Sequence, residues 1–219
     1  MYGLLARKRY GPPKERIDTD PAYAVQKRNY SIFGEVSKAC GLIRKGFEPV
    51  IRYAADSLIN TRLMTPGRAI YKSGMQFSVD HPFHTSAVQQ LKGFRLNKNT
   101  GIHQVFDGKI EVKVDNGYMT VILPGGEMKE VYGASHYRIG CSVCSFDFAK
   151  QEYSSADAGS EILLPKTAAG HRFEFTLPVV FPVHVVVIGV VFYTYVNGDY
   201  HRLNNHTHAA ADVVEVVVR

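Results

Sequence analysis

Two cysteines have a spacing that occurs in metal and redox sites. Cys141 and Cys144 form a CxxC motif, whose chemistry requires two thiolates to converge on one atom. In a regular strand, however, residues three apart point to opposite faces, and the only other cysteine is Cys40. Buried core thiols therefore explain these residues better than a zinc site, and three unevenly spread cysteines indicate no disulfide framework.

Three histidines near the end of the chain form a second group of possible metal ligands. His201 precedes His206 and His208, which would point to one side of an extended segment. Asp199 or Asp212 would then supply an oxygen ligand. A polar loop between two strands explains the same residues without a metal, and no carboxylate spacing fixes the geometry. We therefore expect neither a metal nor a cofactor.

The sequence contains no recognisable catalytic set. It lacks the Gly-x-Ser-x-Gly and His-Glu-x-x-His motifs and shows no pair of carboxylates arranged for acid–base chemistry. Asp147 lies between Phe146 and Phe148, a setting that can raise the pKa of a carboxyl group, although an outward-facing acid on a strand is the ordinary interpretation. We therefore predict that the protein is not an enzyme.

Tyrosine is abundant, with 13 residues, whereas tryptophan is absent. Tyr193, Tyr195 and Tyr200 flank the turn at Asn197 and Gly198, so we expect them to form a contact cluster. Tyrosine is enriched in the cores of protein interfaces, and carbohydrate sites favour tryptophan. This composition favours a protein partner over a sugar.

The positive charge is concentrated in the N-terminal third of the chain. Residues 1–72 contain 14 Lys and Arg against 6 Asp and Glu, whereas the formal charge of the whole chain is +6. This asymmetry is typical of proteins that bind nucleic acid, a membrane surface or an acidic protein, although solvated helix faces also produce it. We divide the chain into a basic extended arm (1–19), a helical hairpin (20–72), a linker (73–90) and a β-sandwich (91–219).

Two apolar stripes with helical spacing predict the hairpin. Asp20 and Pro21 are typical of a helix start, and Gly46 is the expected end of the first helix. Pro49 opens the second stripe, which the Pro66-Gly67 pair is expected to interrupt. Such an αα-hairpin is too thin to be stable alone, so we expect it to pack against the β domain or a neighbouring subunit.

In the C-terminal half, apolar and polar residues alternate with the period of β-strands. The expected strands cover 109–114, 118–123, 137–148, 161–164, 171–177, 179–196, 199–203 and 211–218, the third with a bulge or a change of face. Asp115-Asn116-Gly117 and Asn197-Gly198 are typical hairpin turns. The run 179–196 has nearly the length of a membrane span, but Pro182, His184 and its valines favour a central strand. The fold predicted is α+β, mainly β: an αα-hairpin followed by an antiparallel sandwich with jelly-roll or Greek-key connections.

Several short sequence segments resemble those of an uncharacterised group of Bacteroidetes-type proteins. They are Arg16 to Tyr23, Arg28 to Gly34, Gly133 to His136 and Val196 to Tyr200. Members of that group run from a basic start through a helical pair into a β-rich half. Lys27-Arg28-Asn29 stands where the group usually has Arg-Glu-Asn. Because the group has no assigned activity, the resemblance implies an architecture and leaves the function open.

These observations predict a structural subunit that binds other copies of itself, in a filament, sheath, shell or phage-like particle. An arm of this composition cannot bury enough surface to order itself, so we expect it to be exchanged between copies. The alternative is a module that binds nucleic acid or an acidic surface through the basic N-terminal third. The first residues lack the apolar core of a secretory signal, so synthesis in the cytoplasm is expected, with assembly in a virion or outside the cell left open. The arm residues expected at the interface are Tyr2, Leu4, Leu5, Arg7, Lys8, Arg9 and Tyr10.

Overall fold

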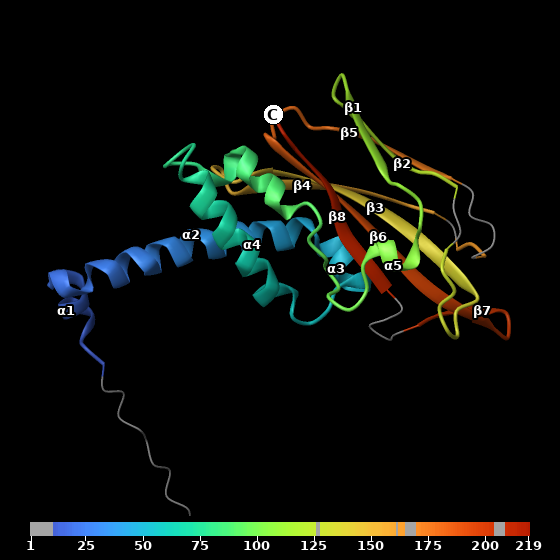
Figure 1. The fold of residues 1–219 in the computed structure, drawn as a ribbon, viewed down its shortest axis with the longest axis horizontal. Helices are drawn as coiled ribbons and strands as arrows, with labels where there is room; N and C mark the ends of the chain where they lie inside the picture. Colours follow the sequence, from blue (N-terminus) through green and yellow to red (C-terminus); the bar gives the residue numbers. More distant parts are fainter. Residues whose placement is uncertain (1–10, 126–127, 161, 165–169, 204–208) are drawn as a thin grey trace, which may run out of the picture.

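The chain folds into an N-terminal group of helices packed against a C-terminal pair of antiparallel sheets (Figure 1). A computed structural model describes residues 11–125, 128–160, 162–164, 170–203 and 209–219. Helices occupy the first half and strands occupy most of the second half, so the predicted α+β class and antiparallel sandwich are confirmed.

Five elements form the N-terminal helical region. Asp20 caps the short second element, where its Oδ1 accepts a hydrogen bond of 2.9 Å from the backbone N–H of Ala22. The elements are α1 (Lys14–Thr19), η1 (Pro21–Tyr23), α2 (Ala24–Gly46), α3 (Glu48–Ala54) and α4 (Ile59–Gly74). The end of α2 at Gly46 agrees with the prediction, whereas 14–19 is helical within the segment expected to be extended.

The second predicted helix differs from the structure at both its middle and its end. The helical stretch breaks between Ala54 and Ile59, and α4 then continues through Pro66. Asp56 explains the break, because its Oδ1 accepts from the N–H of Leu58 at 2.8 Å and its Oδ2 accepts from the N–H of Lys98, also at 2.8 Å. Pro66 lies inside α4, as its eighth residue, where it removes one i→i−4 hydrogen bond without ending the helix.

The segment between the helices and the sheets holds short helical turns and then runs beside the sheet. The turns are η2 (Pro82–His84), η3 (Ser86–Leu91) and α5 (Ile102–Val105). Residues 93–96 form backbone hydrogen bonds with the last strand, including Leu96 N–H to the carbonyl oxygen of Ala211 at 2.7 Å. Regular strands begin at Glu111, close to the first strand predicted, at 109–114.

The strands form a three-stranded and a five-stranded sheet. The smaller sheet has the order β1-β2-β5, and the larger sheet, here called sheet A, has the order β4-β3-β6-β7, with β8 also paired to β6. Both predicted turns have positive φ at their Asn and Gly residues. The strands are β1 (Glu111–Asp115), β2 (Tyr118–Leu123), β3 (His136–Asp147), β4 (Glu152–Gly159), β5 (His171–Thr176), β6 (Val183–Val196), β7 (Asp199–Arg202) and β8 (Ala209–Val218).

Sheet A has elements packed on both of its faces, and the predicted strands differ from the structure in three places. β3 pairs with β6 over residues 136–146 and with β4 over residues 140–147 without a shift of register, so of the two alternatives predicted for it the bulge is absent. Alternate apolar side chains of β3 point to opposite faces, one set toward the helices and the other toward the smaller sheet. β4 was missed because this edge strand is largely exposed and has no apolar alternation. Of the predicted strand at 161–164 the structure describes residues 162–164, where Leu163 forms a single bridge to Tyr137.

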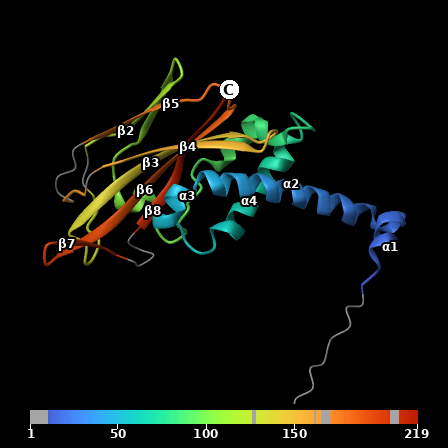
Figure 2. The ribbon, with the colours of Figure 1, turned by 180° about the vertical axis from the view of Figure 1, so that it is seen from behind.

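The helices cover only part of their face of sheet A, and the N-terminal end of the helical region extends away from the body (Figures 1 and 2). α2 and α4 pack together over one end of the face, while α3 crosses nearer its middle. Among the helices that the structure describes, none is long and apolar enough to cross a lipid bilayer. The prediction of no membrane span agrees with this finding.

Candidate functional site

The predicted tyrosine cluster forms on the helix-facing side of sheet A, beyond α3. Tyr195 and Tyr200 are paired across β6 and β7, and their ring centroids lie 4.9 Å apart. The ring of His136, from β3, packs edge-on to Tyr200 at 5.0 Å. The side chains of Tyr195 and Tyr200 remain 49% and 46% exposed, and Tyr193 is half-buried. These residues thus form an aromatic surface at the end of the sheet.

Ser135 fixes the base of this aromatic surface. Its Oγ lies 2.8 Å from Nδ1 of His136 and accepts a hydrogen bond of 2.8 Å from the backbone N–H of Tyr195. The backbone N–H of Ser135 donates to the carbonyl oxygen of Tyr193 at 2.8 Å. The strand ends are therefore held in register, and the rings project from a rigid backbone.

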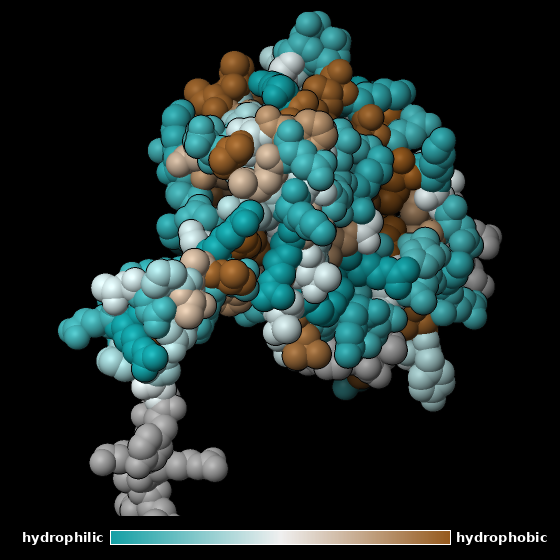
Figure 3. All heavy atoms as spheres, turned by 60° about the vertical axis from the view of Figure 1, so that its left-hand side comes forward, coloured by the Kyte–Doolittle hydropathy of each residue, from teal (hydrophilic) through white to brown (hydrophobic). Residues whose placement is uncertain are grey.

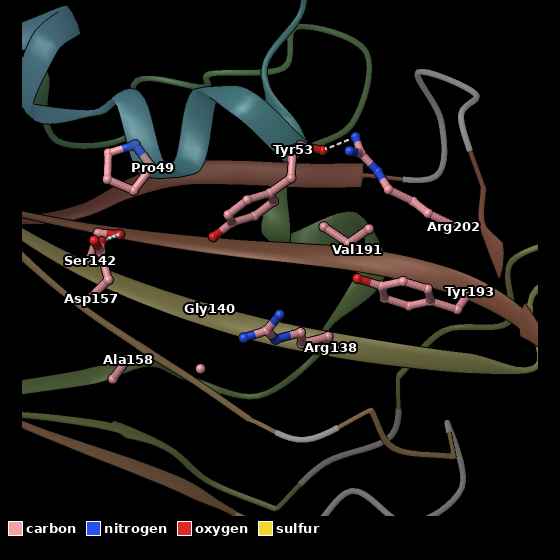
Figure 4. A pocket seen from close by; sticks show the side chains of 11 residues that line it. Pro49, Tyr53, Arg138, Gly140, Ser142, Asp157, Ala158, Val191, Tyr193 and Arg202 are labelled. Carbon is pink, nitrogen blue, oxygen red and sulfur yellow. Dashed lines mark hydrogen bonds between the residues drawn. The ribbon is translucent and has the colours of Figure 1, made fainter. Parts of the chain in front are cut away.

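A pocket of about 310 Å³ lies next to the tyrosine cluster, between α3 and sheet A (Figure 4). Gly140 of β3 lines the pocket, and Gly189 is its cross-strand partner on β6. Tyr53 reaches down from α3 onto these glycines. A Cβ atom on Gly140 would lie 2.5 Å from the Tyr53 hydroxyl oxygen, and one on Gly189 would lie 2.8 Å from the Tyr53 ring. Only residues without a side chain leave room for this tyrosine.

Charged side chains form two walls of the pocket. Arg138 donates from Nε to the carbonyl oxygen of Ser160 at 3.2 Å, and Arg202 donates from Nη2 to the carbonyl oxygen of Tyr53 (Figure 4). Asp157, on β4, accepts a hydrogen bond from the hydroxyl of Ser142. The remaining lining is Pro49, Ala158, Gly159, Val191 and Tyr193.

The electrostatics of the pocket keep the tyrosine neutral. Burial raises the pKa of Tyr53, and the negative charge of Asp157 raises it further, while the positive charge of Arg138 opposes both effects. Tyr53 thus remains a neutral hydrogen-bonding group at physiological pH. It is an anchor for α3 that also presents a hydroxyl to the pocket.

The two cysteines of the CxxC motif lie on opposite faces of β3, as their spacing requires in a regular strand. Cys141 belongs to the core between the two sheets, and Cys144 belongs to the core under the helices. Burial raises the pKa of the Cys141 thiol to about 12, and the Sγ of Cys144 donates to the carbonyl oxygen of Gly46 at 3.1 Å. The two thiols cannot bind one metal ion in this arrangement.

The other predicted metal ligands are placed only in part. His201 is exposed on β7, whereas His206 and His208 lie outside the described residues. Within the described part of the chain, no three His, Cys, Asp or Glu side chains are grouped to hold a metal ion. The metal site therefore has no support beyond the sequence pattern. The arm residues Tyr2, Leu4, Leu5, Arg7, Lys8, Arg9 and Tyr10 also lie outside the described residues.

Asp147 does not have the raised pKa that its apolar neighbours suggested. Burial alone would raise the pKa, but hydrogen bonds from the backbone and the ammonium group of Lys150, with the nearby charge of His84, lower it overall. The Oδ1 atom accepts from the backbone N–H groups of Ala149 and Lys150 at 3.1 and 3.0 Å. The carboxylate therefore stabilises the turn after β3.

The N-terminal end of α2 is a second candidate site, because its apolar face continues beyond the body that it packs on. Val25, Ile32, Val36 and Ile43 follow one another at helical spacing on one face. Val36 and Ile43 are fully buried, Ile32 is partly buried, and Val25 is 72% exposed. α1 and η1 contain no buried residue at all. The exposed part, residues 14–35, is called the helical projection below.

Basic residues line hollows between α2 and α4, on the side of the molecule that Figure 3 brings forward. Hydrophobic patches are scattered there among mostly hydrophilic surface (Figure 3). The guanidinium group of Arg68 lies 5.7 Å from the ring centroid of Phe33, between two pockets of about 580 and 670 Å³. Arg44 lines the first pocket, and Arg28 and Lys72 line the second.

The comparison with known proteins leaves the family open. No family model and no curated protein matches this chain in sequence.

Proposed function

We propose that this protein is a non-enzymatic structural subunit that assembles with other copies of itself, through the helical projection and the arm that precedes it. The observation that carries this proposal is the exposed apolar face at the start of α2, where Val25 is 72% exposed and the helix extends away from the body (Figure 1). Helices this poorly covered are marginal in water, because most helix stability in proteins comes from packing an apolar face. A partner that covers the projection would supply this missing packing.

A second copy of the chain is complementary in charge to the N-terminal region as a whole. The region up to residue 72 has an excess of Lys and Arg, and the remainder has 12 Lys and Arg against 14 Asp and Glu. The basic N-terminal region of one copy therefore complements the weakly acidic remainder of the next, while the projection itself contributes apolar surface. A contact between different surfaces of successive copies is heterologous and can build either a ring or an open filament. The tyrosine cluster offers further exposed area for such contacts.

Light scattering coupled to size-exclusion chromatography, with negative-stain imaging, tests this proposal. We expect wild-type protein to form particles much larger than the 24.4 kDa monomer. Val25→Asp, which places a charge on the exposed apolar face, is expected to shift the population toward monomer. Val79→Asp is the matched control, the same change at a valine that is 69% exposed outside the projection, and it is expected to assemble normally. A wild-type protein that is monomeric at all concentrations tested would contradict the proposal.

The basic hollows between α2 and α4 favour a second candidate function, the binding of nucleic acid or another polyanion. Arg28, Arg44, Arg68 and Lys72 lie within these hollows, and phosphate groups bind such clusters with counterion release. Binding of a single-stranded oligonucleotide should then weaken steeply as salt increases. Arg68→Gln should reduce both the affinity and the salt dependence. Affinity that is independent of salt would exclude this mode of binding.

A further inference from the structure

Sheet A has one edge that is covered and one that is bare. Residues 93–96 cover the edge at β8, where the N–H of Gly93 donates to the carbonyl oxygen of Val213 at 2.8 Å. The N–H of Leu96 donates to the carbonyl oxygen of Ala211 at 2.7 Å. At the opposite edge, β4 makes backbone hydrogen bonds only to β3 among the residues that the structure describes. The bare edge is therefore the outer side of β4.

The pairing with β3 fixes which backbone groups of β4 point outward. The N–H of Ser160 donates to the carbonyl oxygen of Ile139 at 2.8 Å, and the register continues from there along β4 without a shift. In an antiparallel pair, consecutive residues direct their N–H and C=O groups to opposite sides of the strand. The backbone groups that point away from β3, without a backbone partner in the described part of the chain, belong to Tyr153, Ser155, Asp157 and Gly159.

β4 lacks the features that usually protect an exposed edge strand. Such strands commonly carry a lysine, a proline or a bulge, and β4 has none of these. Its one charge in mid-strand, Asp157, accepts a hydrogen bond from the hydroxyl of Ser142, so this carboxylate is turned back toward β3 (Figure 4). β1, at the edge of the smaller sheet, instead carries the charged residues Glu111, Lys113 and Asp115. The edge of β4 is therefore open to another strand.

The sequence of β4 is complementary to itself in one antiparallel register. With Ala156 on a two-fold axis, all four outward-pointing residues pair, and about eight backbone hydrogen bonds form between the copies. Ser155 of one copy then faces Asp157 of the other, and Tyr153 faces Gly159. An aromatic residue opposite an edge glycine is a favourable cross-strand pair. With the axis at Asp157, by contrast, two carboxylates would face each other.

We propose that β4 pairs with β4 of a second copy, antiparallel about Ala156, so that sheet A continues from one chain into the next. On the face toward the smaller sheet the opposed residues are small, because Ser154 faces Ala158 and Ala156 faces itself. This contact joins identical surfaces and is isologous, unlike the heterologous contact proposed for the helical projection. It goes beyond that proposal and does not depend on it.

A cysteine on the proposed axis tests the pairing in the full-length protein. Ala156→Cys places two thiols in a non-hydrogen-bonded pair, where Cα atoms lie about 4.5 Å apart and a disulfide can form. We expect diamide to convert this variant to a disulfide-linked dimer on non-reducing electrophoresis. Glu152→Cys is the matched control on the same face of β4, because its thiols would lie roughly 27 Å apart in this register. The native cysteines are all buried.

Substitutions at Ser155 show whether backbone pairing holds the copies together. Ser155→Pro removes an outward-pointing N–H and leaves the hydrogen bonds to β3 in place. Combined with Ala156→Cys, it should slow cross-linking at least about tenfold, because each copy loses one donor. Ser155→Thr keeps both the N–H and the hydroxyl and should leave the rate unchanged. Circular dichroism would confirm that each variant is folded.

The outcomes separate this proposal from assembly through the helical projection. Adding Val25→Asp to Ala156→Cys should leave the cross-linking rate unchanged, and a loss of cross-linking would show that the β4 contact depends on the projection. Equal cross-linking of Ala156→Cys and Glu152→Cys would indicate random collision and overturn the proposal, as would an unchanged rate with Ser155→Pro.

Another polypeptide is the alternative occupant of the edge. An eight-residue peptide of alternating threonine and valine, followed by fluorescence anisotropy, tests for it. If Ala156→Cys does not cross-link and this peptide binds, the edge accepts a strand from another protein and the assignment to a second copy is wrong.

Discussion

The helix-facing side of sheet A has two ends that differ in composition, although the same strands build both. At the end under α2 and α4, β3 and β6 present side chains that are fully or almost fully buried: Cys144, Phe146, Val183, Val185 and Val187. At the other end the same strands present Arg138, Gly140 and Tyr193 to the pocket, and Gly189 lies under Tyr53. The first end stabilises the fold, whereas the second leaves a pocket at the surface.

Phe146→Ala should have the largest effect, because it removes the central ring of the sealed end. Phe146 is fully buried and stacks on Phe148 with centroids 5.5 Å apart, while Phe47 packs edge-on at 6.2 Å. We expect the free energy of unfolding to fall by about 3–5 kcal/mol in urea denaturation. Tyr195→Ser at the open end serves as the comparison and should cost less than about 1 kcal/mol. Similar losses for the two variants would mean that the two ends do not differ in stability.

His184, whose side chain lies on the opposite face of β6 from Val183 and Val185, gives the fold a dependence on pH. It is fully buried, its Nδ1 lies 2.8 Å from Oγ of Ser145, and burial together with the charge of Arg219 lowers its pKa to about 4. Because its pKa is about 6.5 in the unfolded chain, the unfolded state binds more protons between these values. The stability contributed by neutral His184 is therefore complete above about pH 6.5 and is lost as the pH falls toward 4, by about 3 kcal/mol.

The variant His184→Gln separates this effect from the titration of carboxylates. Urea denaturation between pH 4 and 7 should show a shallower loss of stability for the variant than for the wild-type protein. Parallel curves for the two proteins would show that His184 does not titrate differently on unfolding.

Gly189→Ala tests the open end and should have a smaller effect, of about 1–3 kcal/mol, because the new methyl group would overlap the ring of Tyr53. The cost should largely disappear when Tyr53 is also changed to alanine, since the overlapping ring is then absent. A double-mutant cycle measured by urea denaturation gives this coupling. Additive effects of the two changes would show that the glycine pair does not serve to accommodate Tyr53.

The sequence predicted the elements whose signals are local. The hairpin turns at Asn116-Gly117 and Asn197-Gly198 were found because type I′ turns require residues that accept positive φ. The valine-rich strand was separated from a membrane span by its proline, histidine and terminal turn. The tyrosines that flank this turn share one face because their spacing follows the period of the strand.

What the sequence did not predict depends on partners far apart in the chain. Asp56 ends α3 through the N–H of Lys98, which lies 42 residues away. Tyr53 of α3 packs on Gly140 of β3 and Gly189 of β6, and no local sequence pattern connects these three positions. Single glycines within apolar strands were the one available signal, since such glycines often mark a close approach by another group.

The three buried thiols allow local opening of the protein to be measured by their reaction with thiol reagents. Cys40 lies between α2 and α4, Cys144 lies between sheet A and the helices, and Cys141 lies between the two sheets, all of them buried. Burial raises the pKa of Cys40 to about 11, so few thiolates exist at neutral pH. Thiol reagents can therefore react only during transient opening of the layer that holds each cysteine. Mass spectrometry of the labelled cysteines over time would give the order in which the three layers open.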